Sequence, residues 1–336
     1  MKTIAFIVPY FGKFHSYFQL WLNSCECNPT IDWLVFTDDT RSFKYPSNVH
    51  VTFTNLAAIK EKAESKLGFP IKLDKSYKLC DLKVAYGVIF NEELRSYDFW
   101  GFCDIDLIFG DIRKFVTDDI LQKNDRIFQW GHCSIFRNVP EVNYFFKYKV
   151  DGVFDYEKVL QSPYSFSYDE VCQSGRIFNK YYSTTYYKEW YWFDIDVPSD
   201  LFLPSCSMPG APMVPSIFNY RNGKLYGYYF DKNHLIEREY LYVHFQKRQM
   251  KVKMEECLEK IKKYQIVPDY FKNFEEISID NYNKFTRPRL FNVRAIKFQL
   301  EYYVDAVFDI KWPKMYERGR LKRIFDKIFF RKVYRL

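Results

Sequence analysis

The first third of this 336-residue chain contains four short apolar segments. Between them lie segments whose apolar residues recur at the spacing of a helix. Residues 3–10 contain the uninterrupted run Ile-Ala-Phe-Ile-Val, which is typical of a strand buried on both faces. Further strands are predicted at 33–37, 49–54 and 99–103. Strands that alternate with helices favour a mostly parallel sheet, because a parallel pair needs a crossover connection. We therefore predict an α/β fold whose ligands bind beyond the carboxyl ends of the strands.

The rest of the chain is less regular. Asn222-Gly223 between two apolar runs predicts a hairpin, and Tyr240–Phe245 predicts a further strand. Residues 205–216 hold three prolines and a glycine, which predicts a loop. The pattern from Met250 onward indicates helix. We expect one α/β domain at residues 1–250, followed by a helical extension at residues 251–336.

Positive charge is concentrated at the C-terminus. The net charge is +8, and residues 311–336 hold ten Lys and Arg against two acids. A neutral body with a basic tail argues against a nucleic-acid partner and for one local anionic partner. Apolar and basic side chains segregate to different faces of the final segment, which predicts an amphipathic helix on an anionic membrane surface at residues 315–336.

Long apolar segments are missing from the sequence. No apolar run approaches the roughly 20 residues that span a bilayer. The N-terminal run is also shorter than a signal-peptide core of about 7–15 residues. We expect a cytoplasmic protein that is neither secreted nor transmembrane and that associates peripherally with the inner face of the bacterial plasma membrane.

The most specific chemical motif is Asp104-Ile105-Asp106, directly after the apolar strand at 99–103. Residues i and i+2 of an extended segment point the same way, so two carboxylates can share a hard divalent cation. The alternative is a polar turn at the end of a strand. A second copy, Asp194-Ile195-Asp196, precedes Val197-Pro198, and we interpret it as a surface turn.

Several longer stretches carry a resemblance to known enzymes. Together with the Asp-x-Asp motif after the fourth strand, they resemble GT-A nucleotide-sugar glycosyltransferases, in particular a bacterial group that assembles capsule and surface polysaccharides. The resemblance covers about residues 1–250 and implies a Rossmann-like, mostly parallel sheet flanked by helices. The matching stretches are residues 7–12, 78–87, 100–111, 131–138 and 168–170.

The resemblance implies a surface that binds the nucleotide-sugar donor. Lys247 and Arg248, near the end of the resembling stretch, suit the diphosphate of that donor. The residues of this surface also have interpretations without a donor. Residues 9–11 could form an ordinary turn at the end of a strand, and Asp39 could cap a helix or form a turn. Lys78 and Asp81 could form a surface ion pair, and Lys247 and Arg248 could be solvated cations. The expected donor-binding residues are Pro9, Tyr10, Phe11, Asp39, Lys78, Asp81, Lys83, Asp104, Lys247 and Arg248.

The resemblance also implies a metal and a base. Asp104, Asp106 and His244 are expected to hold Mn²⁺ or Mg²⁺, although a lone strand-end His is often satisfied by local hydrogen bonds. Asp169 is expected to take the proton of the acceptor hydroxyl, with Glu170 beside it, in an inverting reaction. The alternative for this acidic pair is a helix N-terminus. His132 is expected on the sugar or acceptor side.

The expected function is metal-dependent transfer of a sugar from a nucleotide donor, UDP in the first instance, to a hydroxyl of a polysaccharide or lipid-linked oligosaccharide. A retaining reaction, which needs no such base, stays open. One alternative is a nucleotidyltransferase on a similar sheet, although a glycine-rich phosphate loop is missing near residue 10. Another is a carbohydrate-binding or membrane-binding module, consistent with 34 Phe, 29 Tyr and 7 Trp.

Overall fold

The computed structural model describes most of the chain before residue 300. It covers residues 1–182, 185–186, 191–231, 234–246, 248–288, 292, 294–298 and 300. The predicted amphipathic segment at 315–336 lies outside these residues. Among the described helices, none has both the length and the apolar character that crossing a membrane requires.

The largest sheet has seven strands in the order β3-β2-β1-β4-β7-β6-β8. Its first four strands are parallel, which confirms the predicted α/β character, and β7 then pairs antiparallel with both β4 and β6. The carboxyl ends of β1 and β4 therefore meet at one edge. The strands are β1 (Ile4–Tyr10), β2 (Ile31–Thr37), β3 (Val49–Phe53), β4 (Phe99–Cys103), β6 (Arg126–Trp130), β7 (Cys133–Arg137) and β8 (Thr185–Tyr186).

Both faces of β1 are buried, as its continuous apolar run predicts. Phe6 and Val8 belong to the core that includes α1, whereas Ala5 and Ile7 belong to the core that includes α2. Helices therefore cover both faces of this sheet. They are α1 (Phe18–Glu26), α2 (Leu56–Leu67), α3 (Leu79–Leu82), α4 (Tyr86–Ile89), α5 (Ile112–Phe115), α6 (Asp118–Lys123), α7 (Pro140–Asn143), α8 (Tyr156–Gln161), α9 (Arg176–Tyr181) and, later in the chain, α10 (Ile279–Thr286).

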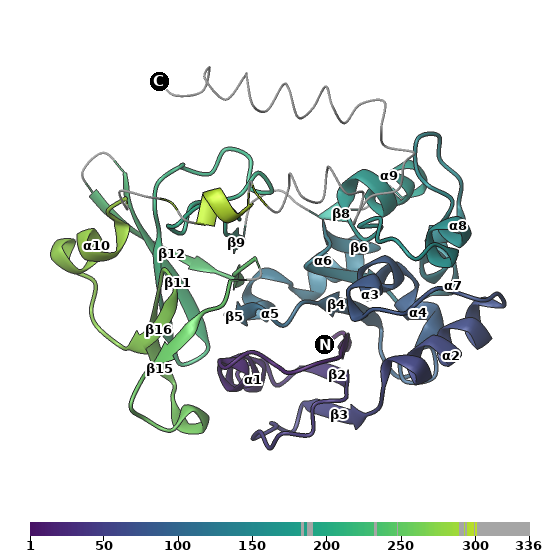
Figure 1. Ribbon diagram of the computed structural model, residues 1–336, viewed down its shortest axis with the longest axis horizontal. Coiled ribbons are helices and arrows are strands. Elements are labelled where there is room, and N and C mark those ends of the chain that lie inside the picture. Colours follow the sequence, from purple (N-terminus) through teal and green to yellow (C-terminus); the bar gives the residue numbers. More distant parts are fainter. Residues whose placement is uncertain are drawn as a thin grey trace.

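A three-stranded sheet in the order β5-β13-β9 lies near the middle of the molecule (Figure 1). Its central strand is antiparallel to β5 and parallel to β9. Residue His244 is the register partner of Leu107 on one side and of Asp194 on the other. The strands are β5 (Leu107–Phe109), β9 (Trp192–Asp194) and β13 (Tyr242–His244).

A six-stranded sheet in the order β12-β11-β10-β15-β16-β14 lies at the left of Figure 1, with α10 beside it. The predicted hairpin is confirmed: Asn222 and Gly223 join β10 to β11 with φ of 49° and 87°, the left-handed values that a two-residue turn of this type needs. The strands are β10 (Ile217–Arg221), β11 (Lys224–Asp231), β12 (His234–Tyr240), β14 (Lys251–Lys253), β15 (Lys263–Val267) and β16 (Tyr270–Asn273).

One helical prediction is wrong. Residues 251–273 contain β14, β15 and β16 in place of the start of a helical extension. β15 pairs with β10 and buries Tyr264 and Ile266, so tertiary pairing outweighs the local helical pattern. Residues 79–89 form α3, a 3₁₀ turn at Lys83–Ala85 and α4 in succession.

Gly101, in the middle of β4, gives a test of this packing. A Cβ atom there would lie 2.6 Å from the main-chain oxygen of Ser134 in β7, and 2.9 Å from the Phe6 ring. We expect Gly101→Ala to lower the free energy of unfolding by about 1–3 kcal/mol, as overpacking of a core does. Urea denaturation measures it. Gly175→Ala is the control, because its Cβ would meet its nearest atoms at an ordinary 3.6 Å; equal losses in both variants would contradict the prediction.

Candidate active site

A cavity of about 720 Å³ opens at the carboxyl ends of β1 and β4. Asp39, Lys78, Asp81 and Arg248 do not line it, and Lys247 lies outside the described residues. The remaining sequence-predicted site residues do line it: Pro9, Tyr10, Phe11, Lys83, Asp104, Asp106, His132, Asp169, Glu170 and His244.

The first Asp-x-Asp motif forms the link between β4 and β5. The amide of Asp104 donates to the carbonyl oxygen of His132 at 2.9 Å, and the carbonyl oxygen of Asp106 accepts from the amide of Phe245 at 2.9 Å. The link is therefore fixed to the β6–β7 turn at one end and to the end of β13 at the other. This anchoring holds both carboxylates at the cavity.

Asp104, Asp106 and His244 form a three-residue cluster. One ligand atom from each lies within 4.8 Å of the others, and His244 Nε2 is 3.3 Å from Asp106 Oδ1. Asp106 and His244 are buried, whereas Asp104 is partly exposed. Two carboxylates and one imidazole are a donor set that suits Mn²⁺ or Mg²⁺ and leaves coordination positions for substrate oxygens. The residues therefore fit a divalent cation.

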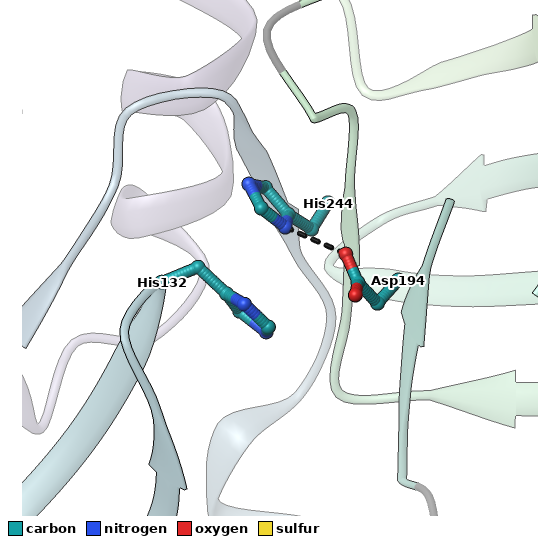
Figure 2. A group of neighbouring side chains, drawn as sticks. All are labelled: His132, Asp194 and His244. Atoms are coloured by element: carbon teal, nitrogen blue, oxygen red, sulfur yellow. Dashed lines mark hydrogen bonds and ion pairs between the residues drawn. The ribbon is translucent and has the colours of Figure 1, made fainter. Parts of the chain in front are cut away.

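The second Asp-x-Asp motif was predicted to be a surface turn, and that prediction is wrong. Asp194 is buried at the end of β9, and its Oδ1 lies 2.8 Å from His244 Nδ1 (Figure 2). The reason is the parallel pairing of β9 with β13, which makes these two residues register partners. The sequence carried one signal for a buried position: like the first copy, this motif follows an apolar, aromatic-rich segment.

The two histidines have opposite electrostatic surroundings. Burial opposes a charge on His244, but Asp106 and Asp194 outweigh it and raise its pKa to about 10. Burial lowers the pKa of His132 to about 3, and the neighbouring His244 adds to this shift. His132 is therefore neutral, and its Nε2 lies 3.0 Å from the hydroxyl of Tyr242.

Lys83 connects the acidic groups of the cavity. Its Nζ lies 2.6 Å from Asp104 Oδ1, 2.6 Å from the carbonyl oxygen of Gly131 and 3.2 Å from Asp169 Oδ2. Burial opposes its charge, but Asp104 and Asp169 raise its pKa well above the usual value. Lys83 thus stays charged and bridges the candidate metal site to the candidate base.

Asp169 and Glu170 line the cavity directly before a π-helical turn at Val171–Gly175, which continues into α9. Burial and the nearby acids raise the pKa of both carboxyl groups, and these effects outweigh the opposing effect of Lys83. A Cβ atom on Gly131 would lie 2.7 Å from an oxygen of each carboxyl group, so a larger residue at this turn would displace both carboxyl groups. The pair is therefore tightly enclosed between the β6–β7 turn and Lys83.

Lys78 and Asp81 lie behind the segment before Asp169 and support it. Lys78 Nζ is 2.7 Å from Asp81 Oδ2 and donates to the carbonyl oxygens of Val159 and Tyr164 at 2.7 and 2.5 Å. The Asp81 carboxylate also accepts from the amides of Phe166 and Tyr168, at 3.0 and 2.8 Å for its shortest contacts. These two residues hold the chain that leads to Asp169.

Asp39 and Arg248 also form hydrogen bonds with main-chain atoms of neighbouring segments. The Arg41 guanidinium, with the amide of Phe14, holds the pKa of Asp39 well below its usual range against the opposing effect of burial. The Asp39 carboxylate thereby orders the segment after β1. Arg248 is fully buried and donates to the carbonyl oxygens of Asp196 and Ser199 at 2.7 and 2.8 Å.

The buried Lys78–Asp81 pair predicts a large stability effect. Asp81→Asn leaves the Lys78 charge without its partner, and breaking a buried pair in this way costs about 3–5 kcal/mol. We expect a loss of that size in the free energy of unfolding, measured by urea denaturation. Glu93→Gln, which breaks the partly exposed pair with Lys62, is the control and should cost less than about 1 kcal/mol. Similar values for the two variants would rule out the supporting role of Asp81.

Comparison with known proteins gives a family and a likeness to solved structures. No curated protein matches this chain. A crystal structure of the galactosyltransferase LgtC in complex with donor and acceptor sugar analogs is similar at 13% identity and a TM-score of 0.32, over 57% of this chain and 75% of that one. A likeness at this level supports no inference about activity. Residues 6–275, which include every site residue above, match the model described as "Family of unknown function (DUF6625)", and the chain therefore belongs to that family.

Proposed function

We propose that this protein is a metal-dependent glycosyltransferase. It moves a sugar from a nucleotide donor, UDP in the first instance, to a hydroxyl of a polysaccharide or lipid-linked oligosaccharide. The observation that carries the proposal is the convergence of Asp104, Asp106 and His244, within 4.8 Å, at a cavity that also holds Asp169. Fold and family alone would not support it, because function depends on the site.

The donor half of the reaction uses the segment after β1 and the acidic cluster. Pro9, Tyr10 and Phe11 line the cavity and offer apolar and aromatic surface to a base or ribose. A divalent cation bound to Asp104, Asp106 and His244 would offset the negative charge of the departing nucleoside diphosphate. Lys83 adds a fixed positive charge on the side of Asp104.

In the acceptor half of the reaction, Asp169 acts as the general base. As the acceptor oxygen bonds to the anomeric carbon and the bond to the diphosphate breaks, the hydroxyl proton passes to the Asp169 carboxylate. The Lys83 ammonium forms an ion pair with that carboxylate from the side of Asp104, which orients it without removing it from the cavity. This sequence of events inverts the anomeric centre.

The acceptor and the location of the enzyme belong to the same proposal. A lipid-linked acceptor would be reached from the inner face of the plasma membrane, with the basic residues at 315–336 against anionic lipid. That segment lies outside the described residues, so this part of the proposal rests on its charge and periodicity alone. The capsule or surface-polysaccharide context likewise rests on the sequence resemblance.

Metal dependence gives the first test. We expect release of a nucleoside diphosphate from one member of a panel of nucleotide sugars in the presence of Mn²⁺, and its loss with a chelator. Asp104→Asn and Asp106→Asn should each lower turnover by about 10²–10³-fold, the scale for loss of electrostatic stabilisation. The exposed Asp151→Asn, which makes the same change of charge, should leave it intact. Release of pyrophosphate from a nucleoside triphosphate would point to nucleotidyl transfer and contradict the proposal.

The base gives the second test. We expect Asp169→Asn to lower the transfer rate by about 10²-fold or more, the usual contribution of a general base, while donor affinity is retained because the base faces the acceptor. Glu170→Gln should have a smaller effect. Rates of sugar transfer and the NMR anomeric configuration of the product check both statements. A retained configuration together with an active Asp169→Asn variant would exclude the inverting assignment.

A further inference from the structure

The hydrogen bonds of Asp194 set it apart from the other acids near the cavity. Its Oδ1 lies 2.8 Å from His244 Nδ1 and accepts from Gln246 Nε2 at 2.6 Å. Its Oδ2 accepts from the hydroxyl of Ser207 at 2.7 Å and from the hydroxyl of Ser205. A carboxylate offers about four lone-pair sites, and here all four are used.

Because the Asp194 carboxylate has no hydrogen-bonding site to spare, one of two clusters of potential metal ligands is the better cation site. His132, Asp194 and His244 (Figure 2) also bring ligand atoms within 4.8 Å of one another. They share His244 with the Asp104 cluster. A cation there would have to displace hydrogen bonds from Asp194. Asp104, by contrast, is partly exposed at the cavity. Asp194 is therefore a support for His244, and the cation belongs with Asp104 and Asp106.

The support acts on the orientation of the His244 ring. A bound cation would take the place of a proton on Nε2, the nitrogen that lies 3.3 Å from Asp106 Oδ1, while Nδ1–H stays donated to Asp194. The ring of His132 stacks on that of His244 with centroids 4.3 Å apart and an angle of 27°. One ring is thus held at its edge by Asp194 and on its face by His132.

We propose that Asp194 is a positioning residue that fixes the tautomer and the orientation of His244 as a metal ligand. The inference rests on the metal site of the proposed function. Partners of this kind raise the basicity of a ligating imidazole, and their loss typically weakens metal binding by about 10–100-fold. Ser205 and Ser207 hold the carboxylate in turn, which links the start of the loop at 205–216 to the metal site.

Metal affinity in the absence of any substrate tests the proposal. Mn²⁺ binding is measured by the EPR signal of the free ion for the wild type, Asp194→Asn and Asp196→Asn. Asp194→Asn keeps the shape of the side chain but can turn its amide NH₂ toward His244, which favours the opposite tautomer. We expect it to bind Mn²⁺ about 10–100-fold more weakly. Asp196→Asn makes the same change of charge two residues along and should bind normally.

A second readout does not depend on affinity. In protein loaded with Mg²⁺, ¹H–¹⁵N correlation spectra of the imidazoles report which nitrogen of His244 carries hydrogen. We expect Nδ1–H in the wild type and a changed pattern in Asp194→Asn. Equal Mn²⁺ affinity and an equal imidazole pattern in the wild type and Asp194→Asn would overturn the proposal. If Asp194→Asn does not fold, Ser207→Ala replaces it as the test. A loss of Mn²⁺ affinity of about two- to tenfold, the value of one hydrogen bond, supports the proposal, and unchanged affinity overturns it.

The outcomes also separate this inference from the proposed function. Two bound Mn²⁺ ions, one of them lost in His132→Ala, would make Asp194 a ligand and overturn the positioning role. A wild type that binds no Mn²⁺ would overturn both proposals. A wild type that binds Mn²⁺, loses affinity in Asp194→Asn and transfers no sugar would overturn the glycosyltransferase alone.

Discussion

The pairing of β13 with both β5 and β9 is the constraint on which the site depends. It makes His244 the register partner of Leu107 on one side and of Asp194 on the other. Side chains alternate along a strand, so a slip of one residue would turn the imidazole to the opposite face of the sheet. The position of His244 is thus set by main-chain pairing on both sides. A rigid strand is a more accurate support for a ligand than a loop.

Charge is the second constraint on the cavity. Four lining carboxyl groups, Asp104, Asp106, Asp169 and Glu170, share the space with Lys83 and His244. Like charges so close together oppose one another, and burial strengthens that effect. Lys83 relieves it by contacting Asp104 and Asp169 together. A divalent cation at Asp104 and Asp106 would relieve it further, which is the electrostatic reason why the acidic cluster and the metal belong to one proposal.

The sequence predicted the elements with clear local patterns and failed where long-range pairing decided. The strand at the N-terminus and the Asn222-Gly223 hairpin appear where apolar runs and turn residues predicted them. Residues 251–273 form strands because β15 pairs with β10, which no local pattern reveals. Lys78 and Asp81 were expected at the donor, yet their partners come from the distant chain around Val159 and Phe166.

What the sequence by itself determined is the order of strands and helices in the first third of the chain and the acidic motif directly after β4, because periodicity and strand ends are local properties of the chain. It could not assign different roles to Asp104-Ile105-Asp106 and Asp194-Ile195-Asp196, which are identical in residue type. Only the tertiary structure does so: sheet register brings Asp194 against His244 across 50 residues of chain, with its oxygens already hydrogen-bonded, and leaves Asp104 at the cavity. Register between distant strands is a property of the assembled sheets, and no local segment encodes it.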